Sequence, residues 1–105
     1  MRRQEGADPL RIRLKSFFHF DVARAFGSEW VELPGERVTL RHVLEEVVER
    51  TRGKVQIIDP VQGIDTEYFV LVNGAEVPSA PESLATELHE GDEVGVGMMH
   101  FWGGG

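Results

Sequence analysis

The sequence predicts an α+β fold in which a mixed sheet of four to five strands packs on one main helix. Two observations support this: an amphipathic helical stretch in the first half of the chain, and short strand-like stretches separated by tight-turn sequences on both sides of it. The chain has 105 residues and is 41% hydrophobic, which suits one globular domain.

Two strands are expected before the helix. In the first, apolar and cationic residues alternate with the period of a half-buried strand, carried by Leu10, Arg11, Ile12, Arg13, Leu14 and Lys15. Trp30 to Leu33 predicts a second strand, which Pro34-Gly35 ends. We expect the two strands to pair antiparallel across a long connection, in which 21–27 predicts a short helical turn.

The helix is the most clearly marked element. Thr39 is a suitable N-cap residue. Gly53 is expected to end the helix, with basic residues near that end. The apolar positions follow the i, i+3, i+4, i+7, i+8 pattern of an amphipathic helix, at Leu40, Val43, Leu44, Val47 and Val48.

The second half predicts a hairpin and a final strand. The stretch 54–66 is ambiguous between a short strand and a loop. Tyr68 to Val72 predicts a buried strand, Asn73-Gly74 a tight turn, and Ala75 to Val77 a returning strand. Leu84 and Leu88 are expected to anchor one helical turn. After a turn at 90–92 comes a last strand, in which Val94, Val96 and Met98 alternate with Gly95, Gly97 and Met99.

This order favours a β-grasp arrangement, in which two hairpins flank one helix and the first and last strands lie parallel in the sheet centre. A ferredoxin-like arrangement would need a second full helix, and the stretch 84–89 is too short to form one. We expect a flexible leader at 1–9, the folded domain at 10–102 and a projecting glycine tail at 103–105.

Composition narrows the function classes. A net charge of −7 disfavours nucleic acid, whose phosphates would be repelled, and favours a basic protein surface as partner. The chain has no cysteine, no apolar run that could cross a membrane and no histidine or carboxylate spacing that predicts a metal site. A cytoplasmic location is expected, because the first residues lack the apolar core of a secretion signal.

Three stretches in this order resemble the MoaD/ThiS family of ubiquitin-like sulfur carriers, most of all the small subunit of molybdopterin synthase. They are Val70-Leu71-Val72-Asn73-Gly74, then 88–94 (LHEGDEV), then the terminal Gly104-Gly105. Leu33-Pro34 and the helix opening Val38-Thr39-Leu40 also fit. The similarity covers roughly Leu10 to Gly105, although the segment 54–66 is longer than in the plainest carriers.

The resemblance implies chemistry at the chain terminus. An adenylating enzyme of the MoeB/ThiF type would use ATP and Mg²⁺ to join the Gly105 carboxylate to AMP, and a sulfur donor would then displace AMP to leave a thiocarboxylate. Gly104 and Gly103 would give the tail a narrow shape without Cβ atoms. No cofactor would be bound by this chain, which would act as a protein cosubstrate or as a non-catalytic small subunit of a sulfurtransferase, beside a MoaE-like large subunit.

The neck before the glycines departs from the family pattern. His100, Phe101 and Trp102 stand where proline and small residues are usual. His100 is expected to serve packing or partner contact rather than catalysis. Phe101 and Trp102 could cover the sheet edge or anchor an interface.

Several alternatives remain open from the sequence. The sulfur could go to molybdopterin, thiamine, cysteine or another thio-metabolite. The same activated carboxylate could instead be amide-linked to lysines by a ubiquitin-like protein modifier, or the tail could be inert.

Two groups of side chains also invite a function. Four of them, Phe69, Leu71, Val94 and Val96, are expected either in the core or in a shallow apolar patch on the sheet. The acidic residues Glu87, Glu90, Asp92 and Glu93 predict a solvated turn or, alternatively, a surface that steers a basic partner.

Overall fold

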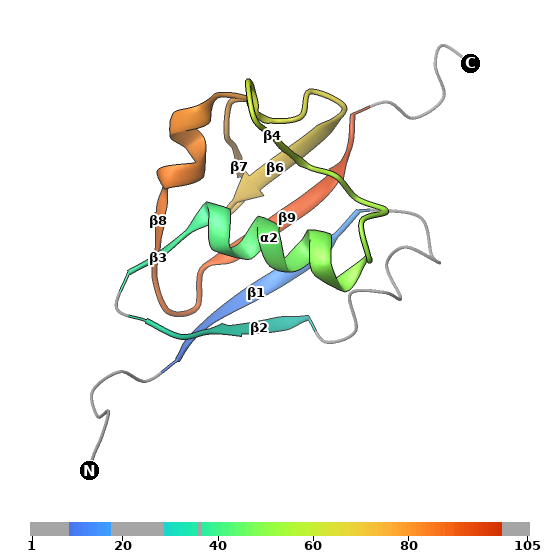
Figure 1. Ribbon diagram of the computed structural model, residues 1–105. Coiled ribbons are helices and arrows are strands. Elements are labelled where there is room, and N and C mark those ends of the chain that lie inside the picture. The colour runs from blue at the N-terminus through green and yellow to red at the C-terminus, as the bar shows by residue number, and fades with distance from the viewer. Residues whose placement is uncertain (1–8, 18–28, 36, 100–105) are drawn as a thin grey trace.

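In the part of the chain that the structure describes, five strands form one mixed sheet, and helix α2 covers one of its faces (Figure 1). The computed structural model describes residues 9–17, 29–35 and 37–99. Across the sheet the order is β2-β1-β9-β6-β7. These strands are β1 (Leu10–Ser16), β2 (Trp30–Leu33), β6 (Tyr68–Val72), β7 (Ala75–Glu76) and β9 (Glu93–Met98). The predicted α+β class and the β-grasp arrangement are confirmed.

The register places the first and last of these strands together in the sheet. β1 pairs antiparallel with β2, with Leu10 opposite Leu33. On its other edge β1 pairs parallel with β9, with Leu14 opposite Val94. β9 is also antiparallel to β6, so it is hydrogen-bonded along both edges. The predicted parallel pair at the sheet centre is therefore present.

Helix α2 (Leu40–Arg50) begins where the sequence predicts. The N–H of Thr39 donates to Nδ1 of His42 at 3.0 Å, which satisfies one backbone donor of the N-terminus. After Arg50 the chain turns with Arg52 at φ 54° and Gly53 at φ 81°. The N–H of Gly53 donates to the carbonyl of Val48, as in a Schellman motif. Gly53 thus lies just beyond the helix it was expected to end.

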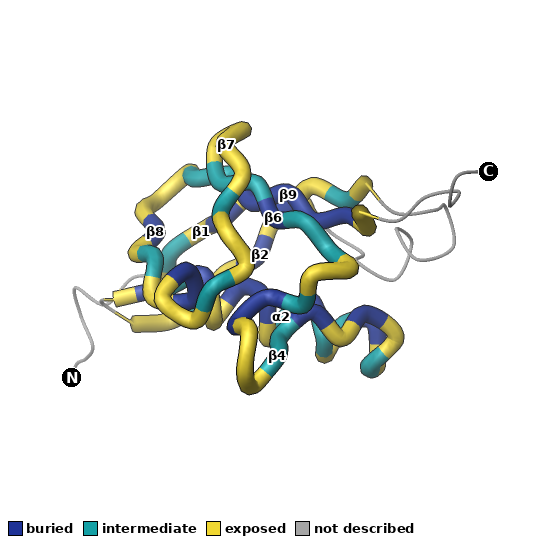
Figure 2. Tube along the Cα trace, turned by 90° about the horizontal axis from the view of Figure 1, so that it is seen from above, coloured by how far each residue is buried: buried dark blue, intermediate teal, exposed yellow. Residues whose placement is uncertain are grey.

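The core lies between the helix and the sheet. Figure 2 shows buried positions along both α2 and β9. The buried side chains come from the alternation in the strands and from the apolar stripe of the helix. They include Ile12, Leu14, Val31, Leu40, Val43, Leu44, Val47, Val70, Val94 and Val96.

The ambiguous segment 54–66 forms a small hairpin of β4 (Ile58–Asp59) and β5 (Gly63–Ile64). Oδ2 of Asp59 accepts the N–H groups of Val61 and Gln62, which fixes the turn. Ile57 and Ile64 are buried, so the hairpin extends the core instead of forming a free loop.

One part of the element prediction is wrong. Leu84 lies in the short 3₁₀ helix η1 (Pro81–Ala85), as expected, but Leu88 does not share its helical turn. Leu88 lies in β8 (Glu87–Leu88), which pairs with β3 (Val38–Thr39). Pairing with β3 and burial of Leu88 favour extended backbone there over a longer helix.

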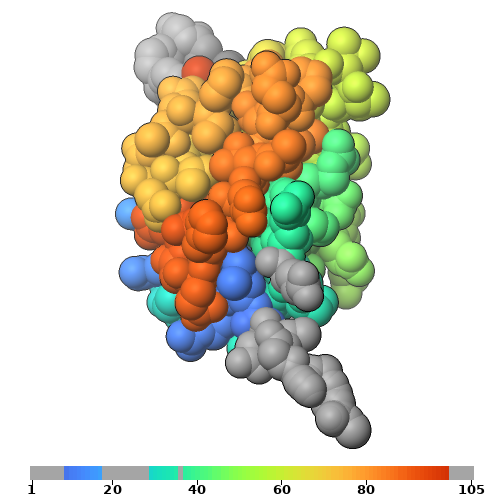
Figure 3. Space-filling view, turned by 90° about the vertical axis from the view of Figure 1, so that its left-hand side faces the viewer, coloured from blue at the N-terminus to red at the C-terminus, as the bar shows by residue number. Residues whose placement is uncertain are grey.

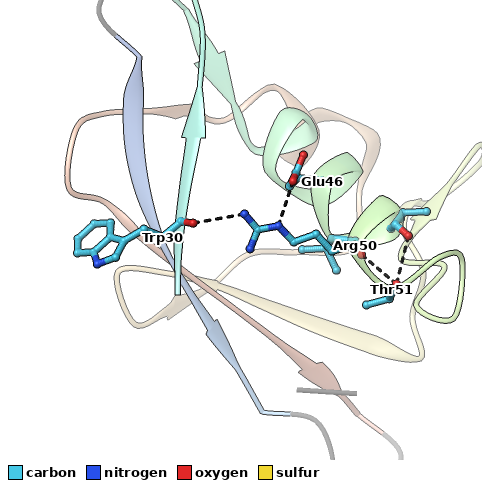
Figure 4. Close-up of polar contacts among 6 residues, drawn as sticks. Trp30, Glu46, Arg50 and Thr51 are labelled. Atoms are coloured by element: carbon cyan, nitrogen blue, oxygen red, sulfur yellow. Dashed lines mark hydrogen bonds and ion pairs between the residues drawn. The ribbon is translucent and has the colours of Figure 1, made fainter. Parts of the chain in front are cut away.

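The end of α2 is attached to both the sheet and the following loop (Figure 4). Arg50 donates from Nε to Glu46 at 3.0 Å and from Nη2 to the carbonyl of Trp30 in β2 at 3.3 Å. The Thr51 hydroxyl donates to the Val47 carbonyl at 2.9 Å and accepts the N–H of Val55 at 3.2 Å.

In the described ranges, no helix is both long and apolar enough to span a membrane.

Candidate functional site

The central strand β9 is the last strand before the predicted reactive tail in the sequence. Met98 and Met99 are 41% and 49% exposed, and the N–H of Met99 donates to the carbonyl of Glu67 at 2.8 Å. The predicted reacting residues Gly105 and Gly104 lie outside the described residues, as do Gly103, Trp102, Phe101 and His100. Their roles therefore stay predictions, and the described part of the site is the sheet surface along β9.

The sheet face opposite α2 carries two aromatic rings over glycines. Val94 and Val96 point into the core, so the alternate positions Gly95 and Gly97 belong to the other face. A Cβ on Gly97 would collide with the Phe69 ring and lie 2.9 Å from Cβ of Phe17. A Cβ on Gly95 would lie 3.0 Å from the Phe17 ring. The two glycines therefore let the rings lie close to the backbone of β9.

These rings form a partly exposed apolar cluster. The ring centroids of Phe17 and Phe69 are 5.7 Å apart with planes tilted by 45°, a favourable aromatic geometry. Phe17 is 47% exposed, and Leu71 is half-buried beside Gly95. We call Phe17, Phe69 and Leu71 the open-face patch. It lies beside β9, the strand that leads to the tail.

The sequence left open whether four apolar side chains belong to the core or to a patch on the sheet, and the structure places two of them in each. Val94 and Val96 are core residues, fully buried against the helix side. Phe69 and Leu71 lie in the open-face patch. The sequence alone does not place Phe17 in this patch. The one indication in the sequence was the alternation of Gly95 and Gly97 in a predicted strand, which leaves room for neighbouring rings to cover the backbone.

The cationic side chains of β1 lie on the same sheet face as the open-face patch, at alternate positions of the strand. Arg11 stands 5.4 Å from the ring centre of Trp30, and Nζ of Lys15 stands 5.3 Å from that of Phe17. Arg13 makes longer ion pairs with Glu29 at 3.6 Å and Glu93 at 4.0 Å. Each of these exposed contacts contributes little to stability. They do show that Arg13 already has carboxylate partners within the domain.

The acidic turn is bound to the rest of the domain. Glu90 accepts the N–H of Arg11 at 2.9 Å and Nε of Arg11 at 3.0 Å. The hydrogen bond from the Arg11 backbone, followed by that from its side chain, holds the pKa of the Glu90 carboxyl below its ordinary value. Figure 3 shows the surface of this turn against the start of β1.

Asp92 links the turn at 90–92 to the turn at Asn73. It accepts the N–H of His89 at 2.8 Å and the Asn73 side-chain amide at 3.1 Å. The Asn73 side chain in turn accepts the N–H of Glu93 at 2.9 Å. The acidic cluster therefore connects two turns to β1 and β9, and two of its carboxylates, Glu90 and Glu93, already form ion pairs with cations of β1. Glu87 lies in β8, which pairs with β3 at the start of the helix.

The described histidines form no metal centre. His42 serves the start of α2, and Nδ1 of His89 lies 3.8 Å from Asp92. Within the described part of the chain, no group of three histidine and carboxylate side chains could hold a metal ion. His19 and His100 lie outside the described residues.

Several solved structures have the same architecture as this chain. Small archaeal modifier protein 1 from Haloferax volcanii matches 84% of this chain and 95% of its own, with a TM-score of 0.57 and 21% identity. The Methanosarcina acetivorans protein of the same name matches 86% and 93%, with a TM-score of 0.58 and 21% identity.

The fold is a ubiquitin-like β-grasp. A Pyrococcus furiosus protein, provisionally named subunit 1 of a molybdopterin converting factor, matches 85% of this chain and 97% of its own, with a TM-score of 0.54 and 23% identity. The resemblance seen in the sequence is thus confirmed at the level of the fold. The sequence matches no protein-family model, and it is not close enough to any curated protein to show a relationship.

Proposed function

We propose that this β-grasp protein is a sulfur carrier whose Gly105 carboxylate is the reacting group. The observation that carries the proposal is the position of Gly103-Gly104-Gly105 in the sequence, shortly after the central strand of a ubiquitin-like fold. Glycines have no Cβ and can follow a narrow channel into the active site of another protein. An exposed apolar patch beside the same strand supplies a surface that a partner could bind.

The proposed chemistry has two steps, and both use catalytic groups of a partner. In the first, a Gly105 carboxylate oxygen attacks the α-phosphorus of ATP, pyrophosphate leaves and an acyl adenylate forms. In the second, hydrosulfide attacks the acyl carbon, a C–S bond forms, the C–O bond to AMP breaks, and AMP and a proton are released. The product is a terminal thiocarboxylate. The activating partner would be an adenylating enzyme of the MoeB/ThiF type using Mg²⁺.

We further propose molybdopterin formation as the pathway, with a MoaE-like large subunit as the sulfur-accepting partner. Two findings support it: the resemblance of 70–74 and 88–94 to the molybdopterin synthase small subunit, and the fold shared with the Pyrococcus furiosus protein. The neck His100-Phe101-Trp102 would then enter the partner's pocket together with the glycines.

A second function is favoured by the other structural neighbours. Two of them are named small archaeal modifier proteins. If this chain acts in that way, the Gly105 acyl adenylate would be attacked by a lysine amine of a target protein, and an amide bond would replace the bond to AMP. Both functions need the same activated terminus.

One experiment separates these possibilities. The full chain is incubated with ATP, Mg²⁺, the adenylating enzyme of the same organism and sulfide, and its intact mass is measured. The carrier predicts replacement of one oxygen by sulfur at Gly105, whereas the modifier predicts amide-linked conjugates when target proteins are added. A chain lacking Gly104-Gly105 should keep its fold and lose either product. Failure of the full chain to form an adenylate with any such enzyme would contradict both functions.

A further inference from the structure

A single row of residues crosses the open face of the sheet and ends in opposite charges. Lys15 of β1 lies opposite Gly95 of β9, Gly95 lies opposite Leu71 of β6, and Leu71 lies opposite Glu76 of β7. Residues directly opposite each other in adjacent strands share a sheet face. The row therefore consists of a cation, a glycine, an apolar side chain and an anion, and it passes through the open-face patch.

The two end charges differ from the other charges near the patch. Arg11 and Arg13 already have carboxylate partners in the domain. Among the described residues, neither Lys15 nor Glu76 has an ion-pair partner, and both are exposed. Three strand spacings separate them, roughly 14 Å. Lys15 contacts the patch through the Phe17 ring, and Glu76 flanks it beyond Leu71.

We infer that the partner of this face is a protein surface with an apolar projection set between a carboxylate and a cation, in that order from β1 to β7. The partner's carboxylate would face Lys15 and its cation would face Glu76. This inference rests on the proposed function, because the activating enzyme is the partner that would contact this face while it holds the tail. It makes more specific the expectation of a basic partner surface, which considered net charge alone.

The oriented arrangement has a functional consequence. An apolar patch by itself can be bound in several rotational settings, since the hydrophobic effect is not directional. Two unpaired charges of opposite sign on either side of the patch favour one setting, because rotation by half a turn places like charges together. A fixed setting directs the end of β9, and with it the tail, toward one point on the partner.

The test measures binding of the full chain to the adenylating enzyme of the same organism, and adenylation of the chain by it. Lys15→Glu and Glu76→Lys are compared with the wild type at low and moderate salt. We expect each single variant to raise Kd by roughly three- to tenfold, with a smaller effect at higher salt. Lys54→Glu and Glu49→Lys are matched controls, because they make the same charge changes at exposed positions outside the sheet face and should change Kd by less than about twofold.

The double variant Lys15→Glu/Glu76→Lys distinguishes orientation from net charge. If the partner only senses net charge, the two single variants shift Kd in opposite directions and the double variant returns to the wild-type value. The oriented row predicts instead that both single variants weaken binding and that the double variant is weaker than either. Opposite shifts, or no shift in either single variant, would overturn the inference. If the wild type binds the enzyme but is never adenylated, the proposed function is contradicted. The Kd values of the variants still show whether the charges of Lys15 and Glu76 orient the partner.

Discussion

The ring of Phe69 occupies the space in which a Cβ at position 97 would lie. Gly97 is therefore part of the surface that shapes the open-face patch although it has no side chain: it sets how near the ring lies to β9. The same region contacts Cβ of Phe17, which has little freedom to move because it is next to the backbone. A substitution at this glycine tests whether the patch has one defined shape.

We predict that Gly97→Ala displaces the Phe69 ring and lowers the free energy of unfolding by about 1–3 kcal/mol, the usual cost of overpacking. Denaturant unfolding gives the stability, and ring-proton chemical shifts report the displacement. Phe69→Ala is the matched background. On it, Gly97→Ala should cost much less, because the colliding ring is gone. Equal costs on both backgrounds would show that the ring contact is not the cause.

Gly63 should tolerate substitution worst among the described glycines with a positive φ. It has φ 82°, and a Cβ there would collide with the backbone of Ala80 and Pro81. Gly91 is a matched control, because it has φ 87° but no atom within 4 Å of the place that a Cβ would take. Gly91→Ala should cost about 1–2 kcal/mol for the left-handed backbone alone. Gly63→Ala should cost roughly 1–3 kcal/mol more, for overpacking.

Thermal and denaturant unfolding of the two alanine variants make this comparison. A Gly63→Ala variant as stable as Gly91→Ala would mean that the β4–β5 hairpin can move away from η1 at little cost. The structure argues against this, because Ile64 next to Gly63 is buried.

The Thr51 hydroxyl should stabilise the end of α2 measurably. Thr51→Val keeps the shape of the side chain but leaves the buried N–H of Val55 without its acceptor, at a cost of about 1–3 kcal/mol. Thr51→Ser keeps the hydroxyl and should recover most of the loss. Urea unfolding checks both variants, and amide exchange at Val55 gives a local readout. A Thr51→Val variant as stable as the wild type would contradict a stabilising role for the hydroxyl.

Glu90 predicts a specific dependence of stability on pH. Its folded pKa lies below its ordinary value, so its stabilisation is fully present above that ordinary pKa and is lost as the pH falls through the lower, folded pKa. The free energy of unfolding of the wild type should therefore exceed that of Glu90→Gln at neutral pH, and the gap should close as the pH falls through the folded pKa. Unfolding curves at several pH values measure the gap. A gap that is constant over this range would contradict the Arg11–Glu90 contact as its cause.

Elements with local signals were predictable from the sequence. The stripe from Leu40 to Val48 predicts α2, and the alternation from Leu10 to Leu14 predicts β1, because both patterns need only the period of one element. Leu88 was misplaced because its conformation depends on pairing with Val38, fifty residues earlier in the chain. The hairpin in 54–66 was ambiguous for a related reason: two-residue strands carry almost no periodicity.

The candidate site was predictable only in part. The terminal glycines stand out in the sequence, and the patch residues Phe69 and Leu71 were recognised as one of two possibilities. The row from Lys15 to Glu76 could not be foreseen, since it depends on the register of three strand pairs. The internal pairing of Glu90 depends on Arg11, which is 79 residues away.

The central place of β9 also bears on how the domain reaches its native state. β9 separates β1 from β6, so the two halves of the sheet have no edge in common until residues 93–98 are in place. During synthesis, β1 and β6 would each keep an unpaired edge until β9 is made, and such edges are prone to pair with other chains. Insertion of β9 removes two such edges in one step, so an activating enzyme that required the assembled patch would act on folded molecules alone.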